Sequence, residues 1–295
     1  MRNFVYERPT RLADAVALLA DGGLDVARPL AGGTDLIIRL RDGTIRPRTV
    51  VDVKGLAELD AGIAETGDGG LRIGARTVMT DITEDPRIRR DFRALADGAA
   101  VVGSVQIRNR ATLAGNIANA SPAADTVPAL LVYGARVVVI GPDGVRTIPI
   151  DDVLVRSGVT RLASGELITA IELPRPSAPA GAVHVRRTRR RGHDLASVTL
   201  ACAVTADGVT RIGYGSLGPR PLLVVDETGV LAEPASSDAA RMERLEAMFA
   251  DASPSPRSMR ASPEYRLAML RVLGLRAVAV AIERLAERQR GSAPA

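Results

Sequence analysis

Cysteine is nearly absent from this 295-residue chain, in which Cys202 stands alone. One thiol can form no disulfide within the chain and cannot hold an iron–sulfur cluster, which needs about four thiolates. Because Cys202 lies in an alternating apolar run, we predict a buried strand residue and not a catalytic one. The two histidines, His184 and His193, have no metal-ligating residues near them in the sequence, so we predict no metal site.

Tryptophan is absent and aromatic residues make up only 2% of the chain, so aliphatic side chains must fill the core. Long uncharged apolar stretches are also missing: none reaches the roughly 18 residues of a membrane span. The N-terminus MRNFVYERPT lacks the apolar segment of a signal peptide. We therefore interpret the chain as a cytoplasmic protein without membrane association.

Lysine is represented by Lys54 alone, and the net charge of +5 comes almost entirely from arginine. Biased codon usage in a high-GC genome explains this composition. The arginines are scattered among acidic residues, and aromatic residues that could stack on bases are lacking, so we predict no nucleic-acid binding. The length and the 46% hydrophobic content suit two or three compact units.

The pattern of the first 175 residues predicts a mixture of helices and strands. Apolar periodicity and capping residues indicate helices over 10–20, 34–40, 85–100 and 122–133, and strands over 26–30, 49–53, 71–75, 136–140, 145–150 and 166–173. The segment GPDG at 141–144 predicts a hairpin turn. The first elements form a small β–α–β unit that is too short for a full dinucleotide-binding fold.

A proline-rich linker, PRPSAPAG at 174–181, separates this part from the rest. Three strands over 183–189, 196–206 and 210–217 then predict an antiparallel meander. Two helices follow, over 236–250 and 262–289. In the second of these, Ser262 is expected to cap the helix and Pro263 to occupy its first turn.

Two short segments carry the strongest functional signal: PLAGGTDLI at 29–37 and TLAGNIANASPAAD at 112–125. Each gathers glycine, a hydroxyl residue and a polar side chain, as in loops whose backbone N–H groups approach a phosphate closely. The loops start about 80 residues apart, which suggests one ligand with two phosphates held from both sides. Neither segment has the spacing of the common nucleotide-binding motifs.

The first loop admits two interpretations. Gly32 and Gly33 could simply make a strand-to-helix turn, but the residues that follow favour a ligand. Thr34 can donate its hydroxyl to a phosphate. Asp35 is unsuited to a phosphate and more plausibly accepts from a ribose hydroxyl or from loop amides.

The second loop is open to the same question. Thr112, Gly115 and Asn116 could form a capped turn, or they could bind an anion with Asn116 as an amide donor. Asp125 follows Pro122 by three residues and could be a first-turn acid that stabilises a helix dipole. A methyl group at Ala114 is compatible with the loop only at negative φ.

The two loops, in this order, resemble those of the FAD-binding subunit of the molybdenum hydroxylases, the family of xanthine, carbon monoxide and nicotinate dehydrogenases. The family has AGGT or AGGS after a strand, then TxGGN followed by Pro-x-x-Asp. The opening FVYERPTRLADAVALLADG resembles the family's start, and SPEYRLAMLRVLGLRAV resembles its C-terminal domain. The resemblance covers residues 4 to about 290, with Ala114 where the family usually has glycine.

The resemblance implies an α+β fold in three parts. A two-part FAD-binding domain is expected at 1–175, with a small β–α–β unit at about 1–55 and a larger mixed α+β unit at 56–175. A C-terminal flavoprotein domain of antiparallel sheet and helices is expected at 182–290.

The resemblance also implies the residues that contact FAD. Asp125 is expected to bond the ribityl chain, and Leu167 and Ile168 to contact the flavin. The family pattern K-x-x-R-x-x-x-D falls on Arg187, Arg190 and Asp194, and a cation there stabilises the reduced flavin. The full expected set is Leu30, Ala31, Gly32, Gly33, Thr34, Asp35, Val102, Thr112, Ala114, Gly115, Asn116, Ala118, Asp125, Leu167, Ile168 and Arg187.

By the same resemblance, the chain is an electron-transfer subunit with no catalytic side chain of its own. A molybdenum subunit oxidises the substrate, an iron–sulfur subunit relays the electrons, and this flavin passes them to NAD, oxygen or a quinone. A homo-oligomer or a higher complex is compatible with this scheme. Two alternatives stay open: a stand-alone flavin oxidoreductase on the same fold, and a non-enzymatic interaction protein that uses the arginine run 186–191.

Overall fold

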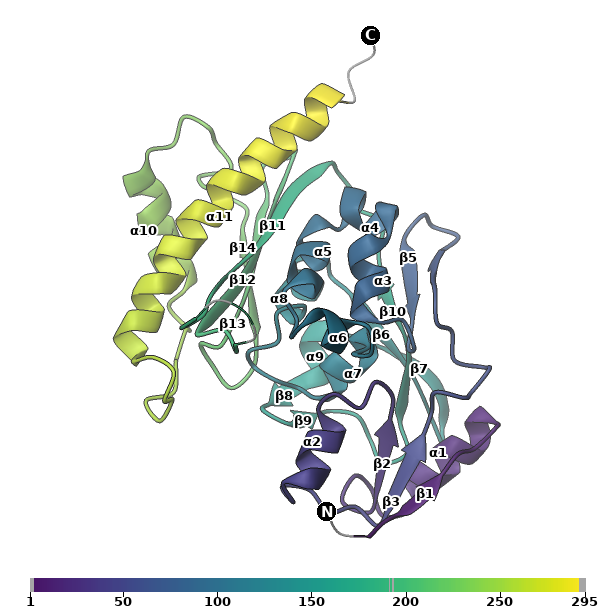
Figure 1. Ribbon diagram of the computed structural model, residues 1–295. Helices are drawn as coiled ribbons and strands as arrows, with labels where there is room; N and C mark the ends of the chain where they lie inside the picture. Colours follow the sequence, from purple (N-terminus) through teal and green to yellow (C-terminus); the bar gives the residue numbers. More distant parts are fainter. Residues whose placement is uncertain (1–2, 191, 193, 292–295) are drawn as a thin grey trace.

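The structure is a computed structural model, and it describes residues 3–190, 192 and 194–291. Two residues discussed above lie outside the described residues: Arg191 of the arginine run, and His193, for which no metal-binding role was predicted. Figure 1 shows the N-terminal half packed against one face of a C-terminal sheet, with the long helix α11 on the opposite face. No helix in the described part of the chain is both long and apolar enough to cross a membrane.

The N-terminal unit is a three-stranded parallel sheet with strand order β1-β3-β2. Its elements are β1 (Val5–Glu7), α1 (Leu12–Ala20), β2 (Ala27–Leu30), α2 (Leu36–Arg41) and β3 (Thr49–Asp52). The small β–α–β unit is therefore confirmed. Thr10 does not cap α1, because the N-cap residue is Arg11, and the first amide of the helix, that of Leu12, donates to the Glu58 carboxylate. The sequence did not predict β1, which is short and largely exposed.

The second unit is a five-stranded antiparallel sheet with order β4-β5-β10-β6-β7. Its strands are β4 (Ile63–Glu65), β5 (Leu71–Gly74), β6 (Arg136–Gly141), β7 (Gly144–Pro149) and β10 (Leu167–Leu173). The predicted hairpin joins β6 to β7. A short pair of strands, β8 (Leu154–Arg156) and β9 (Val159–Thr160), lies apart from this sheet.

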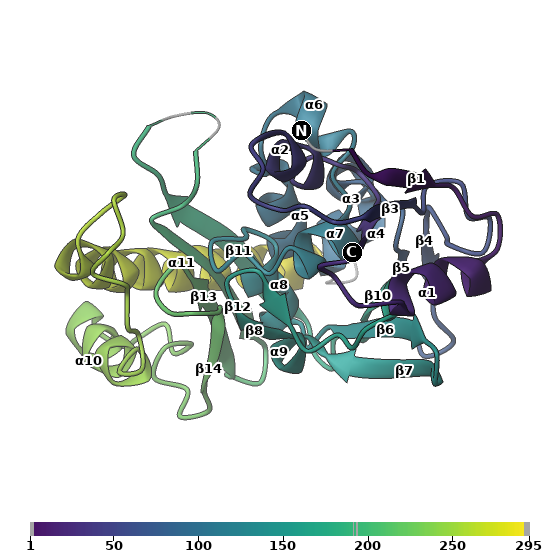
Figure 2. The same ribbon diagram turned by 90° about the horizontal axis from the view of Figure 1, so that it is seen from below.

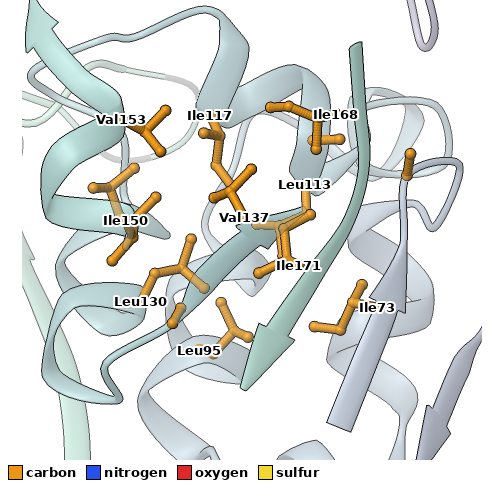
Figure 3. Packing of buried hydrophobic residues seen from close by; sticks show 14 of the residues in the cluster. Ile73, Leu95, Leu113, Ile117, Leu130, Val137, Ile150, Val153, Ile168 and Ile171 are labelled. Atoms are coloured by element: carbon orange, nitrogen blue, oxygen red, sulfur yellow. The ribbon is translucent and has the colours of Figure 1, made fainter. Parts of the chain in front are cut away.

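Short helices surround this sheet and fill the core shown in Figure 3. They are α3 (Met79–Glu84), α4 (Pro86–Asp91), α5 (Arg93–Ala100), α6 (Val105–Arg108), α7 (Leu113–Ala118), α8 (Val127–Val132) and α9 (Ile150–Val153). The core is mainly aliphatic, as the composition requires. It also holds the aromatic pair Phe92 and Tyr133, whose rings pack edge to face with their centroids 5.1 Å apart.

Two helix predictions in this unit were wrong in extent. The predicted helix 85–100 breaks at Phe92, whose backbone leaves the helical region (φ −128°, ψ 44°) while its side chain enters the core. The predicted helix 122–133 begins only at Val127. The carbonyl of Pro122 is not used in a helix, because it accepts a hydrogen bond from the Ser216 amide at 2.7 Å.

The C-terminal part is a four-stranded antiparallel sheet in sequential order. It comprises β11 (Ala180–Arg187), β12 (Val198–Thr205), β13 (Thr210–Gly215) and β14 (Leu222–Asp226), followed by α10 (Asp238–Met248) and α11 (Pro263–Gly291). The predicted meander is confirmed, with β14 as an unpredicted fourth strand. Figure 2 shows α11 running along this sheet. The expected α+β fold class is thus confirmed.

Strand β12 separates the two main cores. Leu200, Cys202 and Val204 join the cluster beneath α11, whereas Ala201 and Ala203 join the cluster of the N-terminal half. Cys202 is fully buried, as predicted, and burial raises the pKa of its thiol. Since side chains alternate between the faces of a strand, the sheet presents large residues to α11 and small ones to the N-terminal half.

We predict that Gly181→Ala strongly destabilises the protein. A Cβ atom at Gly181 would overlap the backbone of α11 and lie 2.9 Å from the Leu285 Cα. Helix backbone cannot yield as a flexible side chain does, so we expect a loss of about 3 kcal/mol, at the upper end of overpacking effects. Urea unfolding measures this. The control is Gly62→Ala, where no atom lies within 4 Å of the added methyl group; equal midpoints in the two variants would contradict the prediction.

Candidate functional site

The first glycine loop lies against the segment that leads into the second. A Cβ atom at Gly32 would overlap the carbonyl oxygen of Arg110 and lie 2.8 Å from its carbonyl carbon. The Arg110 side chain also donates from Nε to the Gly32 carbonyl at 3.3 Å. Gly32 is thus required by contact between the two loops. Gly33 is required by its conformation, because its φ is +77°.

The rest of the first loop runs from the end of β2 to the start of α2. Leu30 is buried and Ala31 is half-buried against the core. Thr34 is half-buried and Asp35 is exposed at the N-cap of α2, where its side chain makes no capping bond. The predicted helix 34–40 therefore starts two residues later, and both polar side chains stay outside it.

The second segment is a capped helix rather than an open loop. Thr112 is the N-cap of α7, and its hydroxyl accepts from the Gly115 amide at 3.0 Å. Ala114 is buried in this helix and is not among the described residues with positive φ, so its methyl group is accommodated. Gly115 and Ala118 are exposed, and at a spacing of three they lie on one side of α7.

Asn116 is held in position by the residue before α8. Its side-chain oxygen accepts from the Thr126 hydroxyl at 2.7 Å. Among the described residues its side-chain nitrogen has no partner. Thr126 is fully buried, which fixes this orientation. Asn116 can therefore present amide N–H groups beside Gly115, as an anion-binding residue must.

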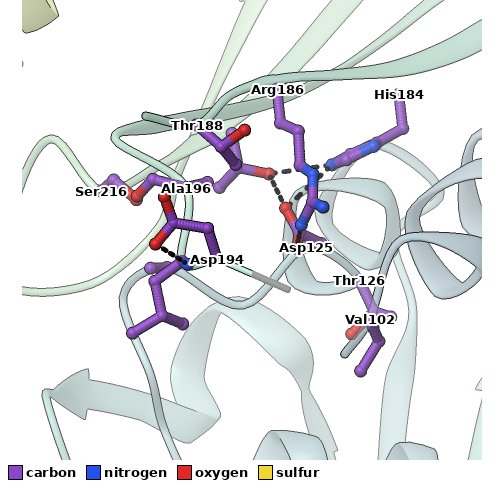
Figure 4. A network of polar contacts seen from close by, with 12 residues as sticks. Val102, Asp125, Thr126, His184, Arg186, Thr188, Asp194, Ala196 and Ser216 are labelled. Carbon is purple, nitrogen blue, oxygen red and sulfur yellow. Dashed lines mark hydrogen bonds and ion pairs between the residues drawn. The ribbon is translucent and has the colours of Figure 1, made fainter. Parts of the chain in front are cut away.

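Asp125 is the centre of a buried polar network that joins the two halves of the protein (Figure 4). Its carboxylate accepts from Arg186 Nη1 at 2.8 Å and from the Thr199 hydroxyl at 3.0 Å. Asp125 precedes α8 by two residues and is 7% exposed. The interpretation of Asp125 as a first-turn acid is therefore wrong, since its partners come from β11 and β12.

His184 completes this network from β11. Its Nε2 lies 2.8 Å from the Thr199 hydroxyl oxygen and 3.5 Å from the Asp125 carboxylate. Because the Thr199 hydrogen is donated to Asp125, the Thr199 oxygen accepts from His184, which places a proton on Nε2. No group of three or more His, Cys, Asp and Glu side chains in the described part of the chain could hold a metal ion.

The arginine run divides between two sides of β11. Arg186 is half-buried and reaches Asp125, whereas Arg187 is exposed and donates from Nε to the Tyr265 hydroxyl at 2.8 Å. Neighbouring residues of a strand point to opposite faces. Of the two, Arg186 contacts the expected site residue Asp125, and Arg187 contacts Tyr265.

The remaining expected residues lie on the core side of the site. Leu167 and Ile168 are buried at the start of β10, which contacts α7 and carries a β-bulge between Ile168 and Ala170. Val102 is half-buried and packs against the same core.

Comparison with known proteins decides the family. The FAD-binding domain of molybdopterin dehydrogenases matches residues 2–176, and the C-terminal domain of the carbon monoxide dehydrogenase flavoproteins matches residues 184–281. The chain belongs to this family. It is an FAD-binding oxidoreductase subunit, and the predicted family and cofactor are confirmed.

Relatives match over nearly their full length. The chain is 34% identical to the putative xanthine dehydrogenase FAD-binding subunit of Escherichia coli (strain K12), over 94% of this chain and 95% of the relative. It is 32% identical to the carbon monoxide dehydrogenase medium chain of Afipia carboxidovorans, over 94% of this chain and 96% of that relative. A crystal structure of the Cu,Mo-CO dehydrogenase matches with a TM-score of 0.85 at 31% identity, over 95% of this chain and 98% of the other.

The residues of the paired loops fit the pyrophosphate of FAD. Gly115 and Ala118 leave the α7 backbone open on one side, and Asn116 directs its free amide nitrogen near them. Gly32 allows the first loop to lie directly against the backbone of Arg110 and Ala111, just before α7. The exposed Asp35 is unpaired among the described residues and can accept from a sugar hydroxyl.

Sequence reasoning missed four residues that contact the expected ones. Arg110 bonds the first loop, Thr126 orients Asn116, Thr199 joins Asp125 to His184, and Arg186 bonds Asp125. Arg186 had a sequence signal, because it neighbours the predicted Arg187.

We predict that Gly32→Ala weakens FAD binding at least tenfold and Gly32→Val more than 100-fold. Even a methyl group would overlap the Arg110 carbonyl and push the two loops apart. At about 1.4 kcal/mol per tenfold change, these losses correspond to about one and two charge-assisted hydrogen bonds. Titration of the FAD-free protein with FAD measures the affinity. Gly67→Ala, which adds a methyl group to open space, should bind FAD normally, and wild-type affinity in both Gly32 variants would refute the assignment.

Proposed function

We propose that this chain is the flavin relay of a molybdenum hydroxylase complex. In this proposal it receives electrons from an iron–sulfur subunit, after a molybdenum subunit has oxidised the substrate, and delivers them to NAD, oxygen or a quinone. The proposal rests above all on the match of both family domains across almost the whole chain. The matched relatives include medium chains and FAD-binding subunits of dehydrogenases.

The chain's own residues bind and orient the cofactor, while FAD supplies the two-electron chemistry. We propose that Gly32, Gly33 and Thr34 hold one side of its pyrophosphate, and that Thr112, Gly115 and Asn116 hold the other. The Thr112 hydroxyl caps α7 by accepting from the Gly115 amide, so its own hydrogen remains available to the pyrophosphate.

We further propose that Arg186, rather than Arg187, is the cation that lies near the flavin. Arg186 bonds Asp125, the residue expected at the ribityl chain, and both groups are partly shielded from water. The network with Thr199 and His184 fixes Asp125 from the other domain. In this arrangement the C-terminal domain sets the position and charge of the groups around the cofactor that the N-terminal domain binds.

The relay proposal predicts a complex that contains three kinds of redox centre. Affinity purification of this chain from its source organism should yield partner subunits, with FAD, iron and molybdenum in fixed ratio. Metal analysis and the absorption spectrum measure this. A chain that purifies alone with stoichiometric FAD, and that oxidises a small molecule without iron or molybdenum, would contradict the relay and establish the stand-alone oxidoreductase.

We predict that Arg186→Gln lowers the two-electron potential of the bound flavin by about 20 mV. A unit charge at about 5 Å in an effective dielectric near 20 is worth about 3 kcal/mol, which partial exposure reduces to about 1 kcal/mol. A cation favours the reduced, more negative cofactor, so its removal lowers the potential, at about 30 mV per 1.4 kcal/mol. Spectroelectrochemistry measures this shift.

Arg187→Gln distinguishes the two neighbouring arginines. Because Arg187 lies on the opposite side of β11 and bonds Tyr265, its variant should leave the potential within a few millivolts of the unmodified protein. A larger shift in Arg187→Gln than in Arg186→Gln would restore the original assignment.

A further inference from the structure

A cavity of about 340 Å³ lies between the β11–β12 connection and the start of α11. Arg187, Thr188, Arg189 and Ser197 line it from the sheet, and Arg260, Ala261 and Tyr265 line it from the chain that enters α11. Of the residues expected to contact FAD it contains only Arg187, whose side chain bonds Tyr265. Its walls therefore hold three guanidinium groups and three hydroxyl groups, without a carboxylate.

The arginines of this cavity have few acidic partners among the described residues. Arg187 bonds only a tyrosine hydroxyl, and Arg189 has a long contact of 3.8 Å with Asp194. The Arg260 side chain has no partner among the described residues. Some other arginines pair closely with carboxylates, among them Arg186 with Asp125 and Arg244 with Asp226, each at 2.8 Å. The cavity thus concentrates positive charge that the protein does not neutralise.

A buried cation adds to this excess beside the cavity. Arg266 is 4% exposed and has no acidic partner among the described residues. Its guanidinium donates to the Ser216 carbonyl at 2.8 Å and to the Ser258 hydroxyl, but its Nε is buried without a partner. Burial and the neighbouring Arg260 lower its pKa. An anion in the cavity would offset this charge, because buried cations are costly unless paired.

The hydroxyl groups extend the donor set. Ser197 is 1% exposed yet lines the cavity, and its hydroxyl has no partner among the described residues. The Tyr265 hydroxyl accepts from Arg187, so its own hydrogen remains available. Guanidinium forks together with hydroxyl donors match the several oxygens of a phosphate group.

We propose that this cavity binds the phosphate groups of a phosphorylated small molecule, free pyrophosphate or a nucleotide. Its separation from the FAD site rests on the position of Arg186 proposed above, because Arg187 and Arg186 lie on opposite sides of β11. The anion site itself depends on the residues that line the cavity. The proposal concerns a second anion that binds while FAD is present.

The test is calorimetric titration of the FAD-loaded full chain with inorganic pyrophosphate, at constant ionic strength and saturating FAD. We expect one saturable site per chain. Arg260→Gln should weaken binding at least tenfold, because it removes a charged hydrogen-bond donor. The matched control is Arg257→Gln on the same segment, whose exposed side chain has no partner among the described residues and lies outside the cavity. This control should bind within twofold of the unmodified protein.

Two results would overturn the proposal: no saturable binding, or equal weakening in Arg257→Gln and Arg260→Gln, which would mean attraction by net charge alone. Sulfate that competes as well as pyrophosphate would also overturn it, as a nonselective anion effect. Titration with ADP identifies the source of the phosphate: at least tenfold tighter binding than pyrophosphate indicates a nucleotide, and equal binding indicates free pyrophosphate. The flavin spectrum, unchanged in every variant, verifies that the FAD site is intact.

Discussion

The close approach of the N-terminal half to the C-terminal sheet is the constraint on which the rest of this structure depends. At Gly213 and Gly215 an added Cβ would lie 3.0 Å from the Pro128 carbonyl carbon and 2.6 Å from the Pro122 carbonyl oxygen. With Ala201 and Ala203 on the same side of the sheet, these glycines let the backbones meet. This contact brings Asp125 within hydrogen-bond distance of residues of β11 and β12. Small residues in the C-terminal sheet thereby position a charged residue of the N-terminal half.

The same principle holds at the paired loops. Because Gly32 has no side chain, its backbone lies directly against the carbonyl of Arg110. The Arg110 side chain in turn donates a hydrogen bond to the Gly32 carbonyl. Gly32 therefore lets the two loops lie against each other, and in the proposed site the same glycines leave backbone open to FAD. A substitution at Gly32 changes both together, which is why its expected cost exceeds that of an ordinary turn glycine.

Several arginines of this protein pair closely with carboxylates, and the pair Arg186–Asp125 ties the two halves of the chain together. In the cavity near α11, Arg187 and Arg260 have no carboxylate partner among the described residues, and the buried Arg266 lies close to Arg260. A family whose chemistry comes from its cofactors has no need of catalytic side chains, so an unneutralised cluster of this kind indicates binding rather than catalysis.

The sequence by itself determined the family, the α+β class and most strands, because apolar alternation and the two glycine motifs are local properties. It could not determine that the helix expected at 85–100 breaks at Phe92, since that break depends on a core formed by distant residues. Nor could it tell which of Arg186 and Arg187 contacts Asp125, because a shift of one residue along a strand reverses the face. Only the tertiary structure showed that Arg186 bonds Asp125 on one side of β11 and that Arg187 bonds Tyr265 on the other.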